Sequence, residues 1–93
     1  MAHRVVWSER ALADVDAIAA YIAVDSSSYA RTVVKRILTS TKNLSSFPML
    51  GRQLPEGEDE NLCEVFAYSY GIIHRVESDL VTVIAVIHGK RVL

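Results

Sequence analysis

The stretch YGIIHRVESDLVTVIAVIHGKR, residues 70–91, contains two β-forming runs separated by the polar pair Ser78 and Asp79. A short polar connection between two such runs predicts an antiparallel hairpin. The second run, residues 80–88, is apolar at odd and even positions alike apart from Thr82 and its last residue. A strand that is apolar on both faces is expected in the middle of a sheet, with helices covering one face.

Outside this hairpin, residues 61–68 form a third strand-like run, and residues 3–7 form a short one at the start of the chain. Between them, apolar residues recur at helical spacing over about 9–24 and about 27–45, and Ser8 is a good N-cap for the first helix. The sequence therefore predicts the α+β class. The expected order is an N-terminal strand, a helical hairpin and a three-stranded, mostly antiparallel sheet (β-α-α-β-β-β).

A chain of 93 residues has room for a single core, so we expect one domain spanning residues 1–93. Its apolar runs are too short to cross a bilayer, and its first residues lack the apolar stretch of a signal peptide. The single cysteine, Cys63, fits a reducing compartment and is expected to be a buried structural thiol. A cytoplasmic protein is therefore expected.

The net charge of −1 hides an uneven distribution of acidic residues. Outside residues 55–60 the chain has ten basic against seven acidic residues, a mild positive bias that does not by itself name a partner. The segment itself is expected to be a solvated surface loop. Its four acidic residues are Glu56, Glu58, Asp59 and Glu60.

The three histidines and the cysteine have no ligand-like spacing, and there is no glycine-rich phosphate loop. Neither a metal nor another cofactor is therefore expected. His74 alternates with its neighbours in a strand and is expected to be a half-buried packing residue. His88 follows an apolar strand, where it either caps the strand by hydrogen bonding or belongs to a functional surface.

In order and spacing, these elements resemble the ParE/RelE superfamily, the small toxins of bacterial type II toxin–antitoxin pairs. Pro48 and Gly51, which end the helical part, belong to one of the matching segments. Each segment is weakly specific, and together they cover essentially the whole chain. The matching segments are residues 7–18, 21–23, 31–37, 44–52, 70–76 and 83–91.

The resemblance implies one of two activities. RelE-like members resemble ribosome-dependent mRNA endonucleases, which need a proton acceptor, a proton donor and a cation for the charge that develops on phosphorus. ParE-like members resemble inhibitors of DNA gyrase without a hydrolytic site. Here Gly71 follows Tyr70 where RelE-like members have an arginine, and no tyrosine follows Arg91. These departures favour a gyrase inhibitor, that is, a binding protein and not an enzyme.

Three residues near the end of the chain are the candidates for target binding: His88, Lys90 and Arg91. They are also the residues that an endonuclease would use. The alternative is that Lys90 and Arg91 are only a solvated chain end. A third possibility is a degenerate, non-toxic family member that only binds an antitoxin.

The resemblance also implies a cognate antitoxin, ParD-like, with a ribbon-helix-helix DNA-binding N-terminal part. Its extended tail is expected to place a helix in a groove on the helical hairpin and to pair along the sheet, giving a hetero-oligomer. The candidate antitoxin contacts are Trp7, Tyr21, Tyr29, Arg31 and Lys35, with Arg36 as a further cation. Alternatively, the aromatic residues among them are core residues and the basic ones are only solvated.

Overall fold

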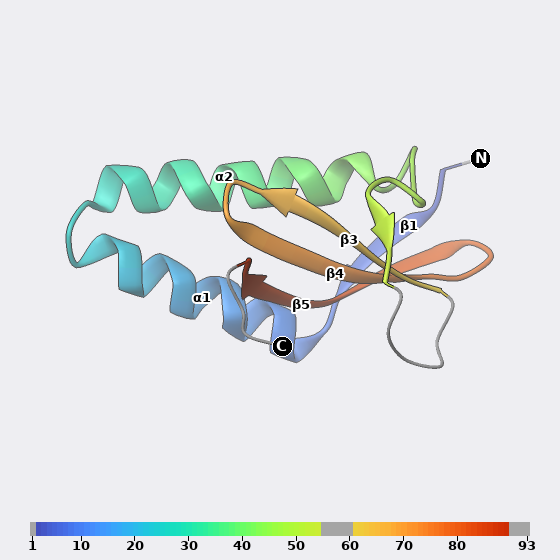
Figure 1. Ribbon diagram of the computed structural model, residues 1–93, viewed down its shortest axis with the longest axis horizontal. Coiled ribbons are helices and arrows are strands. Elements are labelled where there is room, and N and C mark those ends of the chain that lie inside the picture. Colours follow the sequence, from blue (N-terminus) through green and yellow to red (C-terminus); the bar gives the residue numbers. More distant parts are fainter. Residues whose placement is uncertain (1, 55–60, 90–93) are drawn as a thin grey trace.

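The structure, a computed structural model, describes residues 2–54 and 61–89 (Figure 1). It confirms the predicted α+β order, and the helices and long strands lie within two residues of their expected bounds. One short strand, β2, was not expected. The elements are β1 (Arg4–Trp7), α1 (Glu9–Ala23), α2 (Ser27–Asn43), β2 (Arg52–Gln53), β3 (Leu62–Ala67), β4 (Tyr70–Val76) and β5 (Leu80–His88).

The strands form one mixed sheet of five in the order β1-β5-β4-β3-β2, so β5 has a strand on each side, as predicted. The sheet was expected to have three strands and has five, because β1 and β2 also belong to it. The N-terminal strand joins it by pairing parallel to β5, and all other pairs are antiparallel. Residues 52–53, which were not expected in a strand, pair with Cys63 and Glu64. A strand of two residues has no alternating pattern that could reveal it in the sequence.

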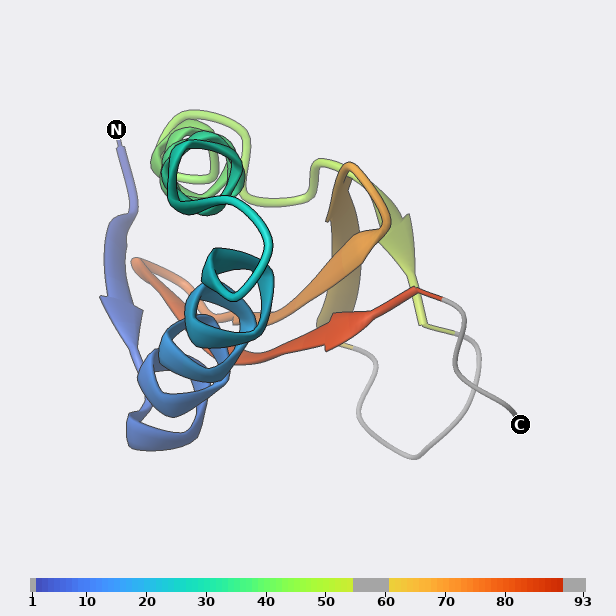
Figure 2. The same cartoon turned by 90° about the vertical axis from the view of Figure 1, so that its left-hand side faces the viewer.

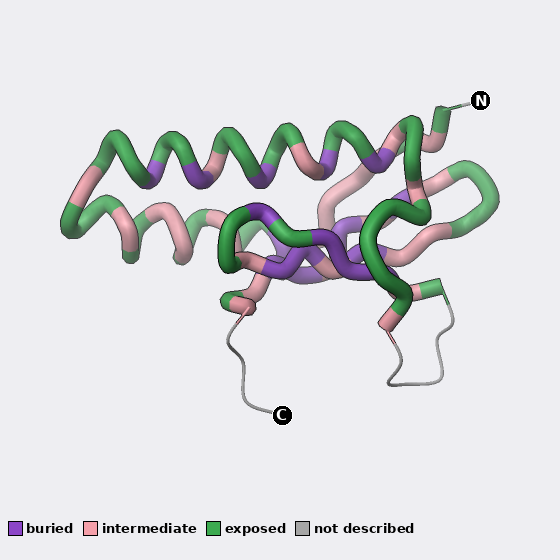
Figure 3. The backbone as a smooth tube through the Cα atoms, turned by 45° about the horizontal axis from the view of Figure 1, so that its top comes forward, coloured by how far each residue is buried: buried purple, intermediate pink, exposed green. Residues whose placement is uncertain are grey.

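Both helices lie on the same face of the sheet, which curls around them (Figure 2). The inward side of α2 is buried, that of α1 is mostly half-buried, and the outward sides of both helices are exposed (Figure 3). Cys63 is 1% exposed, as predicted for a structural thiol. The largest buried apolar side chains of the core are Val33, Ile37, Leu44, Ile72, Val81 and Val83.

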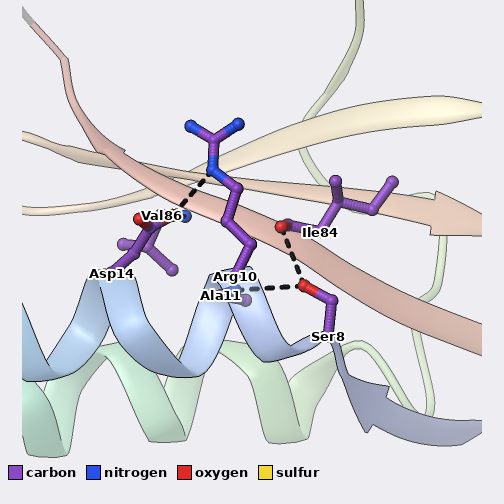
Figure 4. A network of polar contacts seen from close by, with 6 residues as sticks. All are labelled: Ser8, Arg10, Ala11, Asp14, Ile84 and Val86. Carbon is purple, nitrogen blue, oxygen red and sulfur yellow. Dashed lines mark hydrogen bonds and ion pairs between the residues drawn. The ribbon is translucent and has the colours of Figure 1, made fainter.

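The first turns of α1 are hydrogen-bonded to the backbone of β5 (Figure 4). The Ser8 Oγ caps α1 by accepting from the Ala11 N–H at 3.0 Å, and it donates to the Ile84 carbonyl at 2.9 Å. The Asp14 Oδ2 accepts from the Val86 N–H at 2.9 Å. Since β1 ends opposite Val83, these side chains replace the strand neighbour that this part of β5 lacks.

The expectation of a half-buried His74 was wrong, because the side chain is fully buried. Its Nε2 lies 3.1 Å from the Pro48 carbonyl, which fixes the segment that follows α2 to the sheet. Burial lowers the pKa of His74, and the carbonyls of Pro48 and Ile72 oppose this effect. The sequence did not reveal this environment, because Pro48 lies 26 residues away.

Candidate functional site

An open groove of about 670 Å³ lies between α1 and α2. It exists because small side chains line both helices where bulkier ones would fill the space. Arg31 and Lys35 lie at this groove and are exposed, so an apolar floor is accompanied by positive charge. The lining residues are Ala19, Ala20, Ala23, Ser27, Ala30, Arg31, Val34, Lys35 and Leu38.

Of the five residues predicted to contact an antitoxin, the groove brings together Arg31 and Lys35. Trp7 is half-buried and packs against the core. Tyr21 is 79% exposed but lines a different depression, at the other side of α1. Tyr29 is 51% exposed and lies next to a tyrosine of the β3–β4 turn.

The second depression, of about 370 Å³, lies at the end of β5. Here the exposed His88 meets the ring of Tyr70 edge-on, with 5.5 Å between ring centroids, and Tyr21 completes the wall. Burial, with a smaller contribution from neighbouring tyrosines, raises the pKa of Tyr70. Lys90 and Arg91, the other predicted target-binding residues, lie outside the described residues.

The position after Tyr70 lies against a buried carboxylate. A Cβ atom on Gly71 would collide with the Glu64 Oε2. The Glu64 side chain is fully buried, and its Oε1 accepts from the Arg52 guanidinium, 3.3 Å from Nε and 3.0 Å from Nη2. The space that a longer side chain at position 71 would need is therefore taken by an acid.

Sequence reasoning missed the small residues that form the groove, although a signal for them existed. Ala19, Ala20 and Ala23 recur at helical spacing on α1, and Ala30 follows on α2. Of these, Ala19 and Ala30 belong to the apolar stripes that predict the helices, but alanine is too small to fill the space between two helices. The Arg52–Glu64 pair had no signal, because Glu64 interrupts an otherwise apolar strand without a nearby partner in sequence.

Within residues 2–54 and 61–89, no three or more histidine, cysteine or acidic side chains are grouped as a metal site would require. In the same part of the chain, neither helix is long and apolar enough to cross a membrane. The features that the structure does present are an apolar groove, an aromatic depression and exposed cations.

Together they define a small α+β protein with an open groove on its helical hairpin and exposed aromatic and cationic side chains. The family model described as "ParE toxin of type II toxin-antitoxin system, parDE" matches residues 5–93. The chain therefore belongs to the ParE toxin family of type II toxin–antitoxin systems.

Among solved structures, the chain is similar to one described as "Chromosomal ParDE TA system from P. aeruginosa". The two chains are 19% identical, and the match covers 92% of this chain and 95% of that one with a TM-score of 0.76. At this level of identity the likeness establishes a shared fold. A search of curated proteins found no match.

Proposed function

We propose that this ParE-family toxin inhibits DNA gyrase by binding it and that a cognate ParD-like antitoxin keeps it inactive. The observation that carries the antitoxin part is the open apolar groove of the helical hairpin with its two cations. The similar P. aeruginosa structure is described as a ParDE system, which supports a ParD-type partner.

The groove suits one face of an amphipathic helix. Apolar side chains of such a helix would pack on Ala20, Val34 and Leu38, which is the helix-in-groove mode of recognition. Acidic residues along the border of that helix would lie near Arg31 and Lys35. This attraction favours association and orients the bound helix in the groove. An antitoxin tail of this kind would cover the hairpin on the side of the molecule away from the sheet.

Action by binding is supported by the chemistry around Gly71. An RNA-cleaving site needs a cation where charge develops on phosphorus. The glycine supplies no charge, and the adjacent Glu64 carboxylate already holds the Arg52 guanidinium, so position 71 does not provide that cation. The aromatic depression at His88 and Tyr70 offers a contact surface for a protein target instead.

The test is a DNA supercoiling reaction with purified gyrase and purified toxin. We expect inhibition or an accumulation of cleaved DNA, and relief of both when the cognate antitoxin is added. The double substitution Lys90→Ala/Arg91→Ala should weaken inhibition. Lys42→Ala, which removes a cation on α2, should leave it unchanged.

Unimpaired supercoiling at micromolar toxin, together with codon-dependent cuts in translated mRNA, would replace this proposal with a RelE-like endonuclease. No effect in either reaction and no growth defect on expression would instead identify a non-toxic family member. Antitoxin binding measured on the same preparation separates these outcomes from a misfolded sample.

A further inference from the structure

The helix α2 carries four basic residues and no acidic residue in its 17 positions. In the described part of the chain, the ion pairs join Arg10 to Asp14 and Arg52 to Glu64. None of the α2 cations takes part in them. The exposed side of this helix is therefore a row of uncompensated positive charge, although the whole chain has a net charge of −1. The four residues are Arg31, Lys35, Arg36 and Lys42.

One of these cations is stacked on an aromatic ring. The Arg36 guanidinium lies 5.3 Å from the ring centroid of Tyr68, and the ring of Tyr29 lies 6.5 Å from that of Tyr68 at an angle of 52°. Both tyrosines are about half exposed. A cation and two rings thus form a continuous exposed surface beside α2.

The backbone holds Tyr68 in this place in an unfavourable conformation. It lies in the turn between β3 and β4 with a φ of +56°, the left-handed region that a tyrosine rarely adopts. Glycine or asparagine would fit this turn with less strain. A bulky residue kept in a strained turn, with its ring over a basic helix, is a reason to look for a ligand there.

An open pocket of about 500 Å³ lies at this surface. Lys35 and Arg36 provide charge, Tyr68 provides a ring, and threonine hydroxyls and an amide provide further hydrogen-bonding groups. The pocket contains no aliphatic floor, unlike the groove toward α1. The lining residues are Thr32, Lys35, Arg36, Thr39, Asn43 and Tyr68.

We propose that this pocket binds single-stranded nucleic acid, with a phosphate on Lys35 and Arg36 and a base against the ring of Tyr68. Proteins that bind single strands combine cationic tracks with exposed aromatic side chains, and this pocket has both. An acidic peptide helix fits less well, because the pocket is lined by no aliphatic side chain on which such a helix could bury its own apolar face. The site lies on the flank of α2 that faces the β3–β4 turn, whereas the antitoxin groove lies toward α1.

The test is fluorescence anisotropy of the full-length toxin with labelled single-stranded DNA and RNA of about 16 nucleotides, the upper end of the site sizes of single-strand-binding folds. We expect binding at about 50 mM salt that weakens toward about 200 mM. Arg36→Gln should lower the slope of log affinity against log salt by about 0.7, the value for one phosphate contact on a single strand. Tyr68→Asn, which suits the left-handed turn, should weaken binding about tenfold, the order expected for the loss of one stacked base.

Lys42→Gln is the matched control, since it removes one cation from the same helix outside the pocket. Equal losses in Lys42→Gln and Arg36→Gln would show diffuse attraction and overturn the proposal. Duplex DNA that binds as tightly as the single strand, or no binding by any oligonucleotide at low salt, would also overturn it. So would Arg36→Gln and Tyr68→Asn variants that bind nucleic acid normally but lose affinity for the antitoxin. Circular dichroism of each variant shows whether it is folded.

Discussion

The identity of Gly71 is explained by one neighbouring side chain. The Glu64 carboxylate fills the space beside it and cannot easily move, because the Arg52 guanidinium holds the Oε1 atom. We therefore expect Gly71→Ala to lower the free energy of unfolding by about 1–3 kcal/mol, the usual cost of overpacking. Urea denaturation measures this.

The cause of that cost can be isolated by changing the carboxylate. In a Glu64→Ala background, Gly71→Ala should be much better tolerated, because the colliding atoms are gone. In a Glu64→Gln background the cost should remain, since the amide has the same shape. An equal cost in all three backgrounds would mean that strain in the β3–β4 backbone, and not this contact, explains the glycine.

His74 should make stability depend on pH. Its pKa is lowered in the folded protein from an ordinary value of about 6.5. Above that pH both states are neutral and the stability is complete. As the pH falls below about 6.5 the unfolded chain binds a proton that the folded chain does not, so stability falls by up to about 1.4 kcal/mol per pH unit.

Denaturation between about pH 8 and pH 5.5 tests this, since carboxylates titrate mainly below that range. His74→Gln should lose most of the dependence, and His88→Gln, at an exposed position, should keep it. A His74→Gln variant with the same dependence as the wild type would place the titrating group elsewhere.

For single residues, the sequence predicted burial where the residue type and its neighbours in sequence determine it. A lone cysteine in an apolar strand is usually buried, and Cys63 is. Glu64 and His74 were not predictable, because the groups that make their burial tolerable, Arg52 and the Pro48 carbonyl, approach them only after folding.

At the level of the elements, the junction of α1 with β5 should depend on the hydrogen bond between Asp14 and the Val86 N–H. Asp14→Ala would leave the N–H of Val86, a residue 2% exposed, without its acceptor. An unsatisfied buried donor costs about 1–3 kcal/mol, so the variant should unfold at lower urea. Hydrogen exchange of the Val86 amide should accelerate as well.

Two variants control this measurement. Asp14→Asn keeps an acceptor oxygen and should lose less stability. Arg10→Gln removes the exposed partner of Asp14, an i,i+4 surface pair worth no more than about 0.5 kcal/mol. If Arg10→Gln were as destabilising as Asp14→Ala, the ion pair and not the bond to β5 would hold this junction.

Periodicity predicted the helices and the long strands because each repeats its pattern over several residues. It could not show that β1 joins the sheet parallel to β5, since a run of four residues fits either direction equally well. The contact of α1 with the β5 backbone was also hidden. Asp14 looks like any other acidic residue of an amphipathic helix until β5 is placed beside it.

At the level of the whole molecule, a substitution in the groove should weaken antitoxin binding while the protein remains folded. Ala20→Glu would place a charge on the apolar lining of the groove, and we expect at least about tenfold weaker binding of the cognate antitoxin, or about 1.4 kcal/mol. Titration calorimetry with the full-length antitoxin measures it.

Ala13→Glu is the matched control, because it introduces the same charge at an exposed alanine of the same helix away from the groove. It should bind the antitoxin like the wild type. Equal losses in the two variants would show that the antitoxin approaches another surface.

The overall architecture could be predicted from the sequence, whereas the groove depends on the distance and angle between two helices, which no local pattern specifies.

Lys35 lines both the groove toward α1 and the pocket toward the β3–β4 turn. A partner that neutralises its ammonium group from one side withdraws that charge from the other. If both proposed ligands contact it, each must weaken the other by the same factor, because such thermodynamic coupling is reciprocal. A single lysine would then make the antitoxin and the nucleic acid mutual antagonists without any change in the shape of the protein.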